Sequence, residues 1–149
     1  MAATDQILVA VDLAEQSESI IATGITVARA FQAEILLVHT VHELKPLYGV
    51  YLAEKPVSEL QAEVEADARS RLLQFSAEHV RPRYASVREL LLNGVPWRAI
   101  IECAREHRVA LIVVGAHVSQ ATEHKILGST TDRILRHAPC PVLVVPPTP

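Results

Sequence analysis

Short apolar runs alternate along the chain with longer stretches in which apolar residues recur every three or four positions. The runs are typical of strands buried on both faces, and the periodic stretches are typical of amphipathic helices. The runs predict five strands, at residues 6–11, 34–40, 85–92, 110–114 and 142–145. The periodic stretches predict four helices, at residues 17–31, 58–80, 96–107 and 129–138.

Capping residues and prolines set the predicted helix boundaries. Ser17 is a candidate N-cap for the first helix, and the sequence Ser58–Gln61 has the spacing of a capping box at the start of the second. Pro96 suits the first helical position of the third helix. The intervening stretch Val41–Val57 has no clear period and contains two prolines and a glycine, so it is predicted to be a long loop. Loops of that length are uncommon without a function.

The regular alternation of strand and helix predicts an α/β fold with a five-stranded parallel sheet, order 3-2-1-4-5, and helices on both faces. The third strand carries Arg88 and Glu89, which indicates a position at the sheet edge. The 149 residues fit one domain, residues 1–149. In such a sheet the order reverses between the first and fourth strands, and ligands bind where these strands end. Asp12 and Gly115 stand at those two ends.

Composition and charge exclude several classes of function. Half of the residues are apolar but only 4% are aromatic, so the core must be mainly aliphatic. The net charge of −3 and the absence of a basic stripe argue against a nucleic-acid partner. Cys103 and Cys140 form no CxxC pair, which argues against a disulfide framework and a zinc site. No apolar run reaches about 18 residues, so we expect a cytoplasmic protein with no membrane partner.

A glycine and two hydroxyl residues, Gly128, Ser129 and Thr130, open the last predicted helix. Backbone N–H groups and the helix dipole at such a start favour a phosphate. Gly115 allows backbone to approach a ligand closely. The alternative is purely structural: Gly115 ends a strand and Gly128 begins a helix. Asp12 has the same two interpretations, as a partner for a ribose and as a turn residue that caps the following helix.

The segment from Gly115 to Thr130 (GAHVSQATEHKILGST), followed by DRILRHAPCPVLVV, resembles the C-terminal signature of the universal stress protein family. The segments ILVAVD and LLVHT resemble the family's first two strands, so the resemblance covers essentially the whole chain. It implies a homodimer, paired through the last strand, that regulates the stress response through an unknown protein partner. In the nucleotide-binding branch it also implies ATP or AMP as cofactor. Asp12, Gly115, Gly128, Ser129 and Thr130 match that branch, and Thr40 and His117 are added as candidate neighbours of the nucleotide.

Two residues depart from the pattern of the nucleotide-binding branch. Val118 replaces the second glycine of the motif, and its branched side chain fits poorly where a positive φ and a nearby phosphate are required. Thr40 stands where that branch often has valine near the adenine. The rival interpretation is therefore a dimeric protein-interaction module without nucleotide, its pocket closed by Val118.

Neither a catalytic set nor a metal site is predicted. The chain has no GxxxxGK[ST], GxSxG or HExxH motif. The only enzymatic activity that we consider is therefore a weak ATP hydrolysis, for which no catalytic base can be identified. Four histidines lie near the predicted strand ends, but no carboxylate or thiolate stands at ligand spacing to them. They are His39, His42, His117 and His124.

Overall fold

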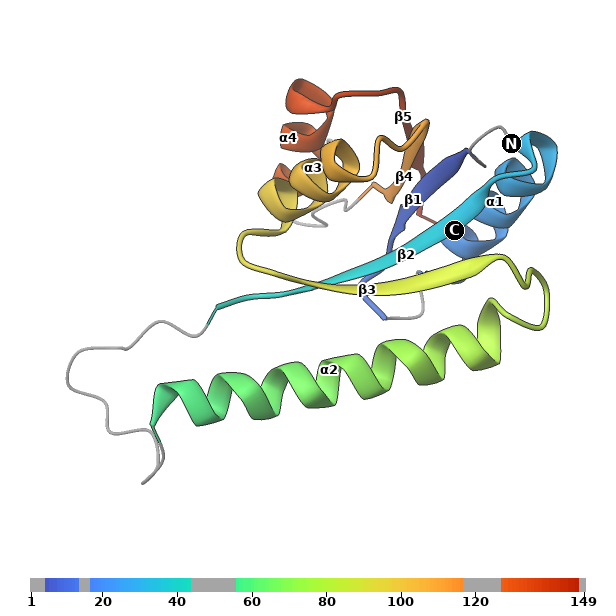
Figure 1. The fold of residues 1–149 in the computed structure, drawn as a ribbon. Helices are drawn as coiled ribbons and strands as arrows, with labels where there is room; N and C mark the ends of the chain where they lie inside the picture. The colour runs from blue at the N-terminus through green and yellow to red at the C-terminus, as the bar shows by residue number, and fades with distance from the viewer. Residues whose placement is uncertain (1–4, 14–16, 44–55, 117–126, 148–149) are drawn as a thin grey trace.

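The computed structural model describes residues 5–13, 17–43, 56–116 and 127–147. These residues form five strands and four helices in strict alternation (Figure 1). The strands are β1 (Gln6–Ala10), β2 (Glu34–Val41), β3 (Val87–Asn93), β4 (Leu111–Gly115) and β5 (Val142–Val145). The helices are α1 (Ser17–Phe31), α2 (Val57–His79), α3 (Pro96–Glu106) and α4 (Ser129–His137). All neighbouring strands are parallel in the order β3-β2-β1-β4-β5, which confirms the predicted fold class.

Two apolar layers sandwich the sheet. On one face, α1 and α2 pack against residues such as Ile7 and Val9 of β1. On the other face, α3 and α4 pack against residues such as Leu8. Successive residues of β1 thus point to opposite layers, and both layers exclude water from them. This two-sided burial explains why the strands appear as continuous apolar runs rather than as alternating patterns.

The predicted start of α2 is wrong. No side chain caps this helix, and Pro56 is its N-cap residue, with an extended backbone (φ −57°, ψ 147°). The Pro56 carbonyl accepts the backbone N–H groups of Glu59 and Leu60, so the helix begins at Val57, one residue before the expected Ser58. The local spacing of Ser58–Gln61 resembled a capping box, but the backbone turn began earlier.

The third strand begins two residues later than predicted. After α2, the backbone N–H groups of Arg83 and Tyr84 both donate to the Val80 carbonyl and form a compact turn. The Tyr84 hydroxyl then donates to the Ala33 carbonyl at 2.6 Å, which anchors this turn to the start of β2. Residue 85 therefore belongs to the connection, and β3 starts at Val87. Its predicted position at the sheet edge is confirmed.

An ion pair joins β3 to the C-terminal end of α2. Arg81 Nε and Nη2 donate to Glu89 Oε1 and Oε2, each at 2.9 Å, and the Ser76 hydroxyl also donates to Glu89. Burial by itself raises the pKa of Glu89, but the hydrogen bonds from Arg81 and Ser76 outweigh it and hold this pKa below its ordinary value. Because the folded state lowers this pKa, the carboxylate stabilises the fold above the ordinary glutamate pKa of about 4.3. That contribution is lost as the pH falls further.

We expect Glu89→Gln to lower the free energy of unfolding by about 1–2 kcal/mol at pH 7, since Arg81 and Ser76 lose a charged acceptor. The difference between wild type and variant should shrink as the pH falls below about 4, because the wild-type carboxylate is then protonated too. Urea denaturation across this pH range measures both effects. The exposed Glu102 provides the control, and Glu102→Gln should leave stability nearly unchanged at every pH. A difference at Glu89 that stays constant with pH would contradict the prediction.

Candidate functional site

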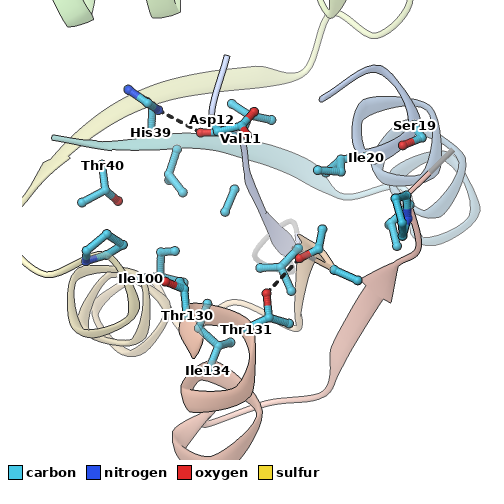
Figure 2. A pocket seen from close by; sticks show the side chains of 18 of the residues that line it. Val11, Asp12, Ser19, Ile20, His39, Thr40, Ile100, Thr130, Thr131 and Ile134 are labelled. Atoms are coloured by element: carbon cyan, nitrogen blue, oxygen red, sulfur yellow. Dashed lines mark hydrogen bonds between the residues drawn. The ribbon is translucent and has the colours of Figure 1, made fainter. Parts of the chain in front are cut away.

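A pocket of about 360 Å³ opens where the carboxyl ends of β1 and β4 lie side by side (Figure 2). Its walls come from the ends of β1, β2, β4 and β5, from α1, and from the first two turns of α3 and α4. From β1 the chain crosses to the α1 layer, whereas from β4 it crosses to the α4 layer. The two crossovers leave in opposite directions, which opens the space between them.

Four of the seven predicted site residues line this pocket: Asp12, Thr40, Gly115 and Thr130. Gly128 and Ser129 do not line it. Gly128 is the N-cap of α4, with φ −58° and ψ 150°, and the side chain of Ser129 is exposed. His117 lies outside the described residues, as do Val118 and His124. The hydroxyl residues of α4 that line the pocket are therefore the second and third helical residues, Thr130 and Thr131, and not the first.

Asp12 is held by a buried serine. The Ser17 hydroxyl donates to Asp12 Oδ1 at 2.9 Å, and Ser17 itself is completely buried in the first described turn of α1. The sequence pattern indicated Ser17 only as a helix cap. Its position five residues after Asp12 gave no sign that the two side chains meet, because no regular helix or strand spacing brings residues five apart into contact. Ser17 thus orients one carboxylate oxygen of Asp12, whose side chain is exposed.

A second buried hydroxyl joins α4 to β4. Thr131 is 2% exposed, and its Oγ1 donates to the Gly115 carbonyl at 2.8 Å (Figure 2). This bond holds the first turn of α4 against the end of β4 and so determines the width of the pocket. Thr131 was not among the predicted site residues. The only signal for it was a third hydroxyl residue directly after Ser129 and Thr130.

Gly115 is required by packing against α1. A Cβ built on Gly115 would lie 2.7 Å from Cδ1 of Ile20, which is closer than two carbon atoms can approach. Ile20 also lines the pocket, so Gly115 gives this side chain the room to lie along the wall instead of across the cavity. Among the described glycines only Gly94 has a positive φ. Glycine stands at position 115 because a larger residue would not fit there, and not because the backbone is left-handed.

A histidine of β2 bonds to the end of β1 at the same edge of the sheet. His39 Nδ1 lies 2.9 Å from the Val11 carbonyl oxygen (Figure 2). A carbonyl can only accept, so Nδ1 carries the proton of this hydrogen bond. The bond ties the end of β2 to the residue before Asp12. His39, His42 and Thr40 all line the pocket, but within the described ranges no group of three His, Cys, Asp or Glu residues could hold a metal ion.

The arrangement suits a ligand that is apolar at one end and anionic at the other. Aliphatic side chains, among them Ile20, Ile100 and Ile134, form much of the wall and can contact a flat ring. The backbone N–H groups of the first turn of α4 precede its first intrahelical bond, from Asp132 N to the Gly128 carbonyl, so they face outward at the positive end of the dipole. The Asp12 carboxylate accepts hydrogen bonds from hydroxyl groups.

The two cysteines lie away from this chemistry. Burial, and to a lesser extent the charge of Glu106, raises the pKa of the Cys103 thiol to about 11, and burial raises the pKa of Cys140. Both thiols are therefore protonated and unreactive near neutral pH. Within the described residues, no helix is both long enough and apolar enough to cross a membrane.

Sequence comparison identifies the family. A model of the "Universal stress protein family" matches residues 3–146 of this chain. The chain belongs to the universal stress protein family. This universal stress protein is 32% identical to universal stress protein A homolog 1 of Coxiella burnetii over 139 residues, which covers 93% of this chain and 94% of the relative.

Solved structures of the family share the fold. The universal stress protein UspA from Lactobacillus plantarum is 28% identical and superposes with a TM-score of 0.68, over 97% of this chain and 99% of that one. The universal stress protein from Archaeoglobus fulgidus in complex with dAMP is 21% identical, with a TM-score of 0.65 over 97% of this chain and 98% of the other. At that identity the second likeness concerns the fold alone.

Proposed function

We propose that this universal stress protein is a homodimeric regulator of the cytoplasmic stress response that binds ATP or AMP in the pocket at the ends of β1 and β4. One observation carries the proposal: a single cavity brings together a carboxylate, Asp12, and the start of a helix, at Thr130. Its volume, about 360 Å³, lies in the range of small-molecule sites. The dAMP complex of the Archaeoglobus fulgidus relative supports an adenine nucleotide as the ligand.

Each part of such a nucleotide has a chemical counterpart in the pocket. The adenine ring would contact aliphatic side chains such as Ile100, with the hydroxyl of Thr40 nearby. The Asp12 carboxylate, oriented by Ser17, would accept hydrogen bonds from ribose hydroxyls. The phosphates would lie against the first turn of α4, where the N–H groups and the Thr130 hydroxyl donate. No residue of the pocket is assigned as a base for hydrolysis, so the proposed activity is binding and not catalysis.

The dimer would form through β5. This strand is at the sheet edge and pairs with β4 on one side. Its four residues are apolar and three of them are only half-buried within a single chain. An apolar edge strand with unpaired backbone groups is a surface for pairing with another chain, which supports a homodimer across this edge.

A second candidate is a dimeric interaction module that binds no nucleotide. The observation in its favour is that Gly128 and Ser129, both matched to the nucleotide motif, lie outside the pocket lining. Val118, which replaces the motif's second glycine, adds to this on sequence grounds. In this candidate Val118 closes the pocket to nucleotides, and the protein acts through the surfaces that bind its partners.

Denaturant unfolding with and without ATP, ADP and AMP distinguishes the two candidates. A nucleotide at 100 times its Kd should raise the free energy of unfolding by about 2.7 kcal/mol. Asp12→Asn should weaken binding at least about tenfold, because the ribose loses a charged acceptor. Asp5→Asn is the matched control, at an exposed aspartate directly before β1, and should bind as wild type does. No stabilisation by any nucleotide would reject the first candidate, and binding gained in Val118→Gly would then identify crowding as the cause.

A further inference from the structure

The chain's only tryptophan lies among three basic side chains on the layer formed by α3 and α4. The Trp97 and His137 rings stack, with centroids 5.1 Å apart and planes at 25°. The guanidinium carbon of Arg98 lies 5.2 Å from the centre of the Trp97 ring, and that of Arg133 lies 5.7 Å from it. We call these four residues the Trp97 cluster. Trp97 and Arg98 belong to α3, whereas Arg133 and His137 belong to α4.

The polar groups of the Trp97 cluster are unpaired within the described part of the chain. No carboxylate there forms an ion pair with Arg98 or Arg133, although Arg81, Arg83, Arg88 and Arg136 each have one. The nearest acid along α4, Asp132, is paired with Arg136. The Trp97 indole N–H is buried and has no hydrogen-bond acceptor among the described residues. Buried donors without a partner are rare in folded proteins, so this group indicates an acceptor that the described residues do not supply.

Stacking prepares the two arginines for binding a carboxylate. A guanidinium held against an aromatic ring loses side-chain freedom before a ligand arrives, and its N–H edge remains available for a bidentate bond. Both guanidinium carbons lie within about 6 Å of one ring centre, so two carboxylates could be bound side by side. In an extended peptide, alternate side chains point the same way and are roughly 7 Å apart. Acidic residues at alternate positions would thus place two carboxylates on one side of such a peptide.

We propose that the Trp97 cluster binds an acidic segment of a partner protein, with aspartate or glutamate at alternate positions of an extended chain. Charge complementarity supports this partner: two unpaired arginines present positive charge on a chain whose net charge is −3. A nucleic acid is a poorer match because the chain carries a net negative charge, and the other arginines that form ion pairs, Arg71, Arg81, Arg83, Arg88 and Arg136, are neutralised by acids. The surface does not require a bound nucleotide.

Fluorescence anisotropy of a labelled peptide tests the proposal on the full-length chain. The peptide carries glutamate at alternate positions, and a matched peptide carries glutamine there. We expect saturable binding of the glutamate peptide alone, weakened at least about tenfold by Arg98→Gln and by Arg133→Gln. Arg69→Gln is the matched control, since Arg69 is an exposed arginine on α2 in the opposite layer, and it should bind normally. The emission of Trp97 should shift with the glutamate peptide at the same midpoint.

Several outcomes would overturn the proposal. Equal binding of both peptides would show that charge does not matter, and an equal loss in Arg69→Gln would show only a general effect of net charge. Tighter binding of a single-stranded oligonucleotide would identify a nucleic-acid surface instead. A drop in molecular mass by light scattering for Arg98→Gln, without peptide binding in wild type, would show that a second copy of this chain occupies the cluster.

Discussion

Gly115→Ala is expected to push the Ile20 side chain into the pocket and to weaken nucleotide binding by at least about tenfold, a loss of about 1.4 kcal/mol. The added Cβ would lie 2.7 Å from Ile20 Cδ1, and Ile20 lines the pocket, so this side chain must move or the helix must shift. Overpacking of this kind also lowers the free energy of unfolding, by about 1–3 kcal/mol. Urea denaturation measures the stability, and nucleotide titration of the folded variant measures the affinity.

Gly24→Ala separates crowding from any effect on the pocket. A Cβ on Gly24 would lie 2.9 Å from Val9 Cγ2, a similar crowding within the same layer, but Gly24 does not line the pocket. This control should retain nucleotide affinity. The double variant Gly115→Ala with Ile20→Val lacks the Cδ1 atom that clashes and should recover most of the affinity. If it binds no better than Gly115→Ala, the contact with Ile20 is not the reason for the glycine.

The sheet could be predicted because its strands are buried on both faces. β1, β2 and β4 each contain an unbroken apolar run of four residues, and helical periods separate them. Strand order then followed from short right-handed crossovers, which leave few topologies for this alternation. The structure moves strand ends by one or two residues only, and β5 has the predicted bounds.

The predicted starts of α2 and β3 were wrong because main-chain hydrogen bonds and a turn, rather than the local residue pattern, set these boundaries. Ser58 has the residue type and spacing of a cap, yet the helix begins at Val57 because the Pro56 carbonyl accepts the first two bonds. The start of β3 was likewise displaced by a turn that Tyr84 anchors to another strand. Neither contact has a signature in the residues next to it, so pattern analysis alone places such boundaries only approximately.

The candidate site was predictable in its location but not in its side-chain directions. Asp12 and Gly115 follow adjacent parallel strands, and that alone brings them to one edge. Which hydroxyl of Ser129, Thr130 and Thr131 faces the cavity depends on the rotation of α4, which packing sets. The bond from Thr131 to the Gly115 carbonyl fixes that rotation and turns Ser129 toward solvent. A short helix start shows no periodicity from which this could be deduced.

The same rotation of α4 connects the two proposals. Thr130, Thr131 and Ile134 face the pocket, whereas Arg133 and His137 lie on the Trp97 cluster. On α3, Pro96 lines the pocket and Trp97 follows it directly. A ligand that shifted the first turn of α4 would therefore move Arg133 relative to Trp97. A nucleotide-dependent change in peptide affinity would be the result of that coupling, and each site remains testable without the other.

Leu8→Ala is expected to lower the free energy of unfolding by about 2–5 kcal/mol, the largest effect of any single truncation considered. Leu8 is 0% exposed at the centre of the middle strand. It lies beside Leu36 of β2 and Ile112 of β4, and α3 and α4 cover it. Removing three carbons there leaves a cavity that neighbours from three elements cannot easily fill, so both the transfer free energy and the packing are lost.

Leu73→Ala makes the same chemical change at the surface. Leu73 is 50% exposed on α2, so its truncation should cost no more than about 1 kcal/mol. Urea unfolding measures the loss of free energy of unfolding in both variants, provided that the m-values are unchanged. Because the same three carbons are removed at both positions, a several-fold larger loss in Leu8→Ala measures the contribution of burial. Similar losses at the two positions would mean that Leu8 is not enclosed between two layers. The β3-β2-β1-β4-β5 order, and with it the pocket at the ends of β1 and β4, would then need to be revised.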